Sequence, residues 1–506
     1  MKFRNVNKEG SLSGRIKSSP NQLLHKEILE PQFNYEIEYL LDSYIQIEKV
    51  LLVEYESMEV LSHAEVSEIA SILDSITAEV LIADPNMNMS DISFAIEKYT
   101  VSQLKKSIPS WHVDRSRNDF QACAQMMAGR EQLLAVAETL LIFGRSVQKL
   151  AADTVCMPMP GYTHYQPAQI ITPGFYLSAI SEHVNNFLSR LLVVYDDAFK
   201  SPLGAGAMSG QELNWNRTRM ANLLGFDQAV PHALMSVASR DWVLRVSAEF
   251  SNFCVSLSRF TSDLIIWGSS EYGFIDLPDS LAGISSSMPQ KKNFPILERI
   301  RGKTAHISSY YFDFVLSQRN TAYTNLVETS KEAGTHVITM FETFHSLLRL
   351  FTVVIDQLKF QEERLHELCE NEFFGGFSLA NMLTLQKHIP YRTAQVVSGQ
   401  YILELKENGM RPTEVDTNLL ISIAGLHGFQ LKITPEEIRK CFCMQNNLYN
   451  KESSGSTNPE IVKKLLETQS AQLDEWLIEW SKRKESIIHA NSLVEKHLFG
   501  ERKGLQ

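Results

Sequence analysis

The sequence is poor in cysteine: six thiols occur among 506 residues, and no two of them form a Cys-x-x-Cys pair. The closest two, Cys441 and Cys443, are spaced too tightly for a zinc knuckle, and no histidine cluster lies beside them. This pattern excludes a disulfide-dense secreted scaffold and favours reduced, buried thiols. We therefore expect the fold to be stabilised by its core, with no disulfide and no bound metal.

Long apolar runs are also absent. Stretches such as residues 350–355 are far shorter than the roughly 20 residues that a helix needs to cross a membrane. Residues 1–14 are polar and lack the apolar centre of a secretory signal. The sequence therefore predicts a cytoplasmic protein with no membrane partner.

Basic residues are outnumbered by acidic ones. Lys and Arg total 48 against 59 Asp and Glu, which gives a net charge of −11. Because general nucleic-acid binding depends on cationic side chains that neutralise phosphates, this balance argues against such a partner. A local basic pocket for a small anion is still compatible with it. The 44% hydrophobic and 21% charged residues are typical of a folded enzyme or scaffold.

The periodicity that is present is helical. Apolar residues recur at alternating spacings of four and three from Val246 to Trp267, which predicts a narrow apolar stripe on a helix roughly 33 Å long. A second stripe at intervals of seven runs from Met126 to Val147. The small residue Gly144 lies between its members and would let a neighbouring helix approach closely. No sustained alternation with a period of two is visible. The sequence thus predicts an all-α fold with long helices in a bundle.

Changes in composition divide the chain into three predicted domains. Residues 1–113 read as a mostly helical N-terminal domain with shorter elements, and residues 114–366 as a central domain of long helices. Residues 367–506 read as a small C-terminal helical domain.

Three polar segments interrupt this pattern and could carry chemistry. Residues 111–119 (WHVDRSRND) offer cationic and amide donors suited to a carboxylate or phosphate, although a solvated helix start would also look like this. Residues 159–169 (MPGYTHYQPAQ) place His164 in a rigid loop, where it is either a structural histidine or a proton donor or acceptor. Residues 283–293 (GISSSMPQKKN) are either a connector or a mobile loop that carries a nucleophile or base.

Together these segments resemble the argininosuccinate lyase branch of the fumarase/aspartase superfamily. Residues 283–293 resemble the superfamily loop G-S-S-x-M-P-x-K-x-N, and residues 112–119 resemble the branch motif H-T-G-R-S-R-N-D. Residues 159–169 resemble M-P-G-Y-T-H-x-Q-x-A-Q. The resemblance extends from about residue 85 to 410, so it covers most of the chain.

This resemblance implies an all-α homotetramer whose long central helices form a 20-helix bundle, with each active site built from segments of three subunits. It implies a carbon–nitrogen lyase that releases fumarate and an amine from a small N-succinyl substrate, without a metal or organic cofactor. Ser285 would be the base that takes a proton from the succinyl carbon, His164 would lie on the proton-donor side, and Glu298 would orient the imidazole. The implied catalytic residues are Ser285, His164, Lys291 and Glu298. The implied substrate-binding residues are Ser116, Arg117, Asn118, Thr163, Asn293, Tyr323 and Lys331.

The sequence also departs from the family pattern, mainly away from the residues that would serve the fumarate half. The departures are Ser93, Asp114, Pro167, Ile284, Leu326 and Glu328. We therefore expect an N-succinyl substrate that need not be argininosuccinate. Argininosuccinate lyase itself, giving arginine and fumarate, is the alternative within the family. A catalytically inactive structural or binding homologue is a further alternative, against which the presence of Ser285, His164 and Lys291 weighs.

Overall fold

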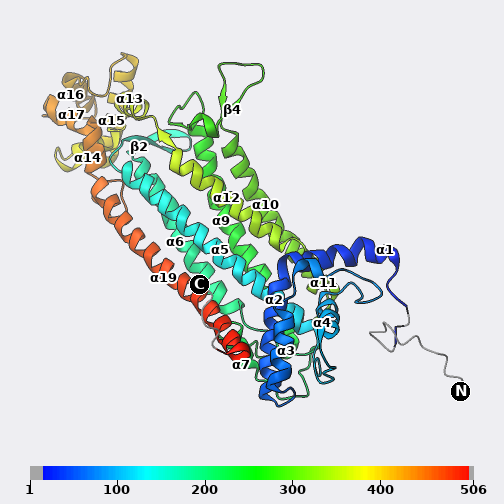
Figure 1. Ribbon diagram of the computed structural model, residues 1–506. Coiled ribbons are helices and arrows are strands. Elements are labelled where there is room, and N and C mark those ends of the chain that lie inside the picture. The colour runs from blue at the N-terminus through cyan, green and yellow to red at the C-terminus, as the bar shows by residue number, and fades with distance from the viewer. Residues whose placement is uncertain (1–14, 17, 501–506) are drawn as a thin grey trace.

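The computed structural model describes residues 15–16 and 18–500, and almost all of its regular structure is helical. The long helices are α2 (Glu30–Ser57), α5 (Arg117–Asp153), α6 (Pro173–Ala198), α9 (Asp241–Trp267), α10 (Pro295–Gln318), α12 (Val337–Gln357) and α19 (Pro459–Phe499). Helices α5, α6, α9, α10, α12 and α19 run side by side as one bundle, and α2 packs on the start of α5 (Figure 1). The predicted all-α fold is confirmed.

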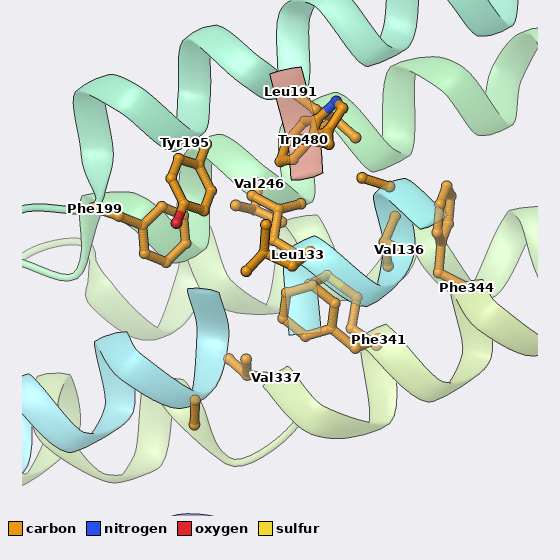
Figure 2. Packing of buried hydrophobic residues seen from close by; sticks show 14 of the residues in the cluster. Leu133, Val136, Leu191, Tyr195, Phe199, Val246, Val337, Phe341, Phe344 and Trp480 are labelled. Atoms are coloured by element: carbon orange, nitrogen blue, oxygen red, sulfur yellow. The ribbon is translucent and has the colours of Figure 1, made fainter. Parts of the chain in front are cut away.

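Aromatic side chains fill the interior of the bundle. Most of the predicted stripe on α9 is buried. Phe253 stacks on Phe187 of α6 with ring centres 4.2 Å apart, and Phe250 stacks on Phe344 of α12 at 4.1 Å. Figure 2 shows Leu133 of α5 and Phe341 of α12 meeting in the same core. Such burial of apolar surface is the main force that holds long helices together.

The small residue predicted to admit a neighbouring helix does so. A Cβ atom built at Gly144 of α5 would lie 3.1 Å from Leu473 of α19 and 3.2 Å from Val184 of α6. The two neighbouring helices therefore approach α5 more closely at this point than a larger side chain would allow.

Shorter helices gather at the two ends of the bundle (Figure 1). At one end lie α1 (Gln22–Leu24), the π-helical turn η1 (His25–Leu29), α3 (His63–Leu73), η2 (Ala78–Val80), α4 (Ile92–Gln103), α7 (Arg217–Leu223), α8 (Ala233–Ala238), α11 (Val327–Ser330) and η4 (Glu332–Gly334). At the other end lie η3 (Asp279–Leu281), α13 (Glu362–Asn371), α14 (Gly376–Leu385), α15 (Tyr391–Glu407), α16 (Thr417–Leu426), α17 (Pro435–Phe442) and α18 (Met444–Tyr449).

The C-terminal part of the chain contributes to two hydrophobic cores. Helices α14 to α17 enclose a core of their own that runs from Leu379 to Phe442. Helix α19 instead returns along α5 and α6 and adds Leu473 and Trp480 to the core of the bundle. The domain boundaries drawn from the sequence stay a prediction.

The described residues also contain three two-stranded antiparallel sheets, which the sequence patterns did not indicate. The strands are β1 (Met159–Thr163) with β2 (Gln166–Ile171), β3 (Ile275–Asp276) with β6 (Lys359–Phe360), and β4 (Gly283–Ile284) with β5 (Lys292–Asn293). Two of these pairs are too short to show any alternation. All three lie at the end of the bundle that carries α13, opposite α2 (Figure 1).

One segment of the described residues, 327–357, is long and apolar enough to cross a membrane by length and composition alone. Most of it is α12, whose side chains Phe341, Phe344 and Phe351 are buried in the bundle against its neighbours. The apolar composition of this segment is therefore explained by its place in the core of the bundle.

Candidate active site

The start of α5 carries three of the predicted substrate contacts. The Ser116 side chain caps the helix by accepting the N–H of Asn118 at 3.2 Å. The Arg117 guanidinium donates to Asp91 at 2.7 Å, and the Asn118 amide donates to the carbonyl of Ala207 at 3.0 Å. Because the first turn of a helix leaves backbone N–H groups unpaired, this end of α5 suits a carboxylate ligand.

A buried carboxylate holds the next loop against this helix start. Asp119 accepts the backbone N–H of Gly204 at 2.9 Å and of Gly206 at 3.0 Å. Burial raises its pKa to about 6, although these two N–H groups act in the opposite direction. Asp119 belongs to the motif at residues 111–119 but is not among the residues predicted to bind substrate. The signal available was an acidic residue close to two arginines at the start of a helix whose inner face is mainly apolar.

Asp114, a departure from the family pattern, has a structural explanation. Its φ is +59°, a left-handed conformation that glycine adopts most easily and aspartate tolerates. Its carboxylate accepts the backbone N–H of Leu213 at 2.8 Å and the indole N–H of Trp215 at 3.0 Å. The replacement therefore adds a second tether to the loop that covers the α5 start.

Lys331 is bound within the chain. Its ammonium forms an ion pair with Glu36 of α2, which also accepts a hydrogen bond from Gln121 of α5 at 3.3 Å. Burial raises the pKa of Glu36 while the charge of Lys331 lowers it. Tyr323, by contrast, lies between α10 and α11 with 60% of its surface exposed.

His164 and Thr163 lie in the β1–β2 hairpin at the other end of α5. Thr163 pairs with Gln166, and the two residues between them have positive φ values of 53° at His164 and 59° at Tyr165, as a type I′ turn requires. Thr163 and His164 are both exposed. The ring of Tyr162 lies 5.6 Å from that of Tyr272, which attaches the hairpin to the segment that leads into β3 and β4.

Ser285 begins the seven-residue loop between β4 and β5. Its hydroxyl accepts the backbone N–H of Met288 at 3.1 Å, and Asn293 donates to the carbonyl of Gly283 at 3.3 Å. Within the described residues, the side chains of Lys291 and Glu298 have no hydrogen-bond or ion-pair partner, and both are exposed. The loop therefore presents its polar groups outward.

The predicted site residues thus fall into two groups, which a single chain does not bring together. The α5-start group is Ser116, Arg117, Asn118, Tyr323 and Lys331. The loop-end group is Thr163, His164, Ser285, Lys291, Asn293 and Glu298. The 37 residues of α5 separate Asn118 from the hairpin by about 55 Å, and α10, whose 24 residues span about 36 Å, lies between the Ser285 loop and Tyr323. Figure 1 shows β2 and β4 at one end, with α2 and α11 at the other.

Each group offers one part of an acid–base reaction on an anion. The α5-start group supplies donors and positive charge, and the loop-end group supplies a hydroxyl, an imidazole, an ammonium and a carboxylate. No cluster of three His, Cys, Asp or Glu side chains suited to a metal ion occurs among residues 15–16 and 18–500.

Comparison with known proteins gives consistent matches over most of the chain. Residues 33–308 match the model of a family described as lyase. Argininosuccinate lyase 1 of Shouchella clausii is 28% identical over 97% of this chain and 100% of its own length, and the argininosuccinate lyase of Acetivibrio thermocellus is 31% identical over 67% and 74%. An EDDS lyase variant with bound fumarate matches at a TM-score of 0.81 with 25% identity, covering 97% of this chain and 99% of that one.

Proposed function

The chain belongs to the argininosuccinate lyase branch of the fumarase/aspartase superfamily, and from this premise we propose that it eliminates an amine from an N-succinyl compound. It is a carbon–nitrogen lyase that releases fumarate. The residues that depart from the family pattern lie outside the predicted fumarate contacts. We therefore propose that the amine product need not be arginine.

The observation that carries this proposal is the separation of the two residue groups. A catalytic hydroxyl must reach the bound substrate. The two groups lie about 55 Å apart at opposite ends of a rigid helix, so no motion within one chain can bring them together. Antiparallel association of copies would bring the loop-end group of one chain to the α5-start group of another. The separation supports active sites shared between chains. In line with the family resemblance, we propose a homotetramer in which three subunits contribute to each active site.

Exposed apolar residues support association of copies. Ile284, beside the base of the Ser285 loop, has 94% of its surface exposed. Phe312 and Leu316 share one face of α10 and are 62% and 58% exposed. Large apolar side chains grouped on one helix face commonly mark an interface.

In the proposed reaction, Ser285 takes the proton from the succinyl carbon, the C–N bond breaks, and its electron pair leaves with nitrogen. His164 supplies a proton to the leaving amine, and Glu298 orients the imidazole. Removal of a proton next to a carboxylate builds a doubly charged intermediate, which Lys291 and Asn293 stabilise. The N-terminus of α5, with Ser116, Arg117, Asn118 and Thr163, binds the succinyl carboxylates. Tyr323 and Lys331 contact the remainder of the substrate.

The test is a fumarate assay. Purified protein is incubated with argininosuccinate and a series of N-succinyl amino acids, and fumarate is followed by its ultraviolet absorbance. We expect turnover of at least one compound by the wild-type protein and a large loss of that turnover in Ser285→Ala. If no compound gives fumarate while the protein is folded and tetrameric, the proposed function is wrong and the chain is an inactive homologue.

A further inference from the structure

A cavity of about 470 Å³ lies among α2, α5, α9 and the segment from α11 to α12. Its deep walls are apolar and buried. They include Leu40, Ala128, Trp242, Val243, Val337 and Ile338. A cavity of this size, with mostly apolar walls and a few polar groups, is typical of a small-molecule site.

The cavity begins next to the predicted carboxylate-binding end of α5. Asn118, Gln121 and Gln125 lie on one stripe of that helix, and Gln125 lines the cavity. Gln125 is seven residues after Asn118, which is about 10.5 Å along the helix axis. Because Lys331, a predicted substrate contact, also lines the cavity, a side chain of the substrate would reach it from the α5-start group.

The charged groups of the interior leave no free carboxylate for a cation. Glu36 is neutralised by Lys331. Arg240 is buried and donates to neutral oxygens only, those of Gln125, Val237 and Ser239. Burial lowers the pKa of Arg240 to about 10, so it stays cationic at neutral pH.

Two other acidic groups line the cavity, and both lie at its mouth. Glu27, in the π-helical turn η1, and Glu332 are exposed to solvent. Their charge is screened by water and reaches the deep walls only weakly.

We propose that this cavity receives the side chain of the amine half, and that this side chain is an aliphatic or aromatic group without a positive charge. The substrates would then be N-succinyl derivatives of apolar amino acids, a class that rests on the lyase function proposed above. An ammonium or guanidinium placed in the cavity would lie among apolar walls beside the Arg240 cation. Burial of a charge without a partner is strongly unfavourable, so the site selects against cationic amines.

The experiment compares two adducts with the same four-carbon side chain. Norleucine and lysine, each carrying the succinyl group on the α-nitrogen, differ chiefly in the terminal ammonium. We expect the wild-type protein to cleave the norleucine adduct with a kcat/KM higher by on the order of tenfold or more. Equal rates, or preference for the lysine adduct or for argininosuccinate, would overturn the proposed class while the lyase function stands.

A variant tests whether the cavity itself is responsible. Ala128→Met narrows the cavity and should lower turnover of the norleucine adduct far more than that of the glycine adduct. Ala137→Met, a buried change on α5 away from the cavity, should lower neither selectively. Equal loss on both adducts in Ala128→Met would count against the cavity as the side-chain site.

If no adduct gives fumarate, the lyase proposal fails and binding decides the cavity proposal separately. Calorimetry with free norleucine and free lysine then gives the answer. Tighter binding of norleucine supports an apolar side-chain site, and the absence of a difference overturns it.

Discussion

At the α2 end of the bundle, Arg117, Asn118 and Lys331 are each bound to another segment of the same chain. At the opposite end, His164, Lys291 and Glu298 have no hydrogen-bond or ion-pair partner among the described residues, and all three are exposed. Contacts within the chain therefore hold the polar side chains in place at one end of the bundle. At the other end the polar side chains are exposed and available to a substrate or to another copy of the chain.

This difference fits a division of labour between binding and chemistry. A binding surface gains affinity when its donors are held in place before the ligand arrives. A catalytic loop instead needs freedom to close over the substrate and to expel water. The helix start suits the first role, and the hairpin loops of the other end suit the second.

The largest expected effect comes from the exposed end. Ser285→Ala removes the proposed base and should lower kcat roughly 10²–10⁴-fold in the fumarate assay. Ser287→Ala, in the same loop, is the matched control and should keep most of the activity. Similar losses in both variants would assign the effect to loop structure and remove Ser285 from the proposed mechanism.

The separation of the two ends can be tested by subunit mixing. Asn118→Asp places a carboxylate where the substrate carboxylate should bind, so it should be as inactive as Ser285→Ala. Mixed tetramers of these two variants should regain about a quarter of the wild-type activity. An active site works only if the chain that supplies Asn118 and the chain that supplies Ser285 are each intact at that residue, which happens in about one case in four.

The control mixture pairs Ser285→Ala with Lys291→Ala. Both changes lie in the same loop, so every combination lacks one of the two loop residues and no activity should return. Recovery in the control, or none in the first mixture, would contradict sites shared between chains.

Stability should separate the two ends as clearly as activity does. Lys331→Met leaves the buried carboxylate of Glu36 without a cationic partner and should lower the free energy of unfolding by about 3 kcal/mol, as measured by urea denaturation. Adding Glu36→Gln should restore much of this loss. Lys291→Met, at the exposed end, should change stability by no more than about 0.5 kcal/mol while lowering turnover.

The sequence predicts the positions of the motifs better than it predicts the long-range contacts and turns that hold the motif residues in place. The stripe on α9 indicates a helix because its period is local. The motif around Ser116 marks the start of a helix, and the motif around Ser285 marks a loop. Glu36 and Lys331 are 295 positions apart, so no local pattern joins them. The β1–β2 turn is hidden because its two central residues are His164 and Tyr165, where asparagine and glycine are usual. The separation of the two residue groups follows from the lengths of α5 and α10, which lie between them in the structure.

The smallest predicted effect concerns the two ends of α5 itself. Asp119 is buried at the start of the helix, and its pKa is raised by burial to about 6, above the ordinary value near 3.9. The folded state therefore binds this proton more tightly than the unfolded state, so the stabilisation by protonation is present below pH 6 and is lost as pH rises through it. Relative to Asp119→Asn, the wild-type protein should lose about 1.4 kcal/mol of unfolding free energy between pH 5 and pH 7.

Asp153→Asn removes an exposed carboxylate from the other end of the same helix and should keep the wild-type pH dependence. Parallel curves for the wild-type protein and Asp119→Asn would mean that the buried carboxylate does not titrate in this range.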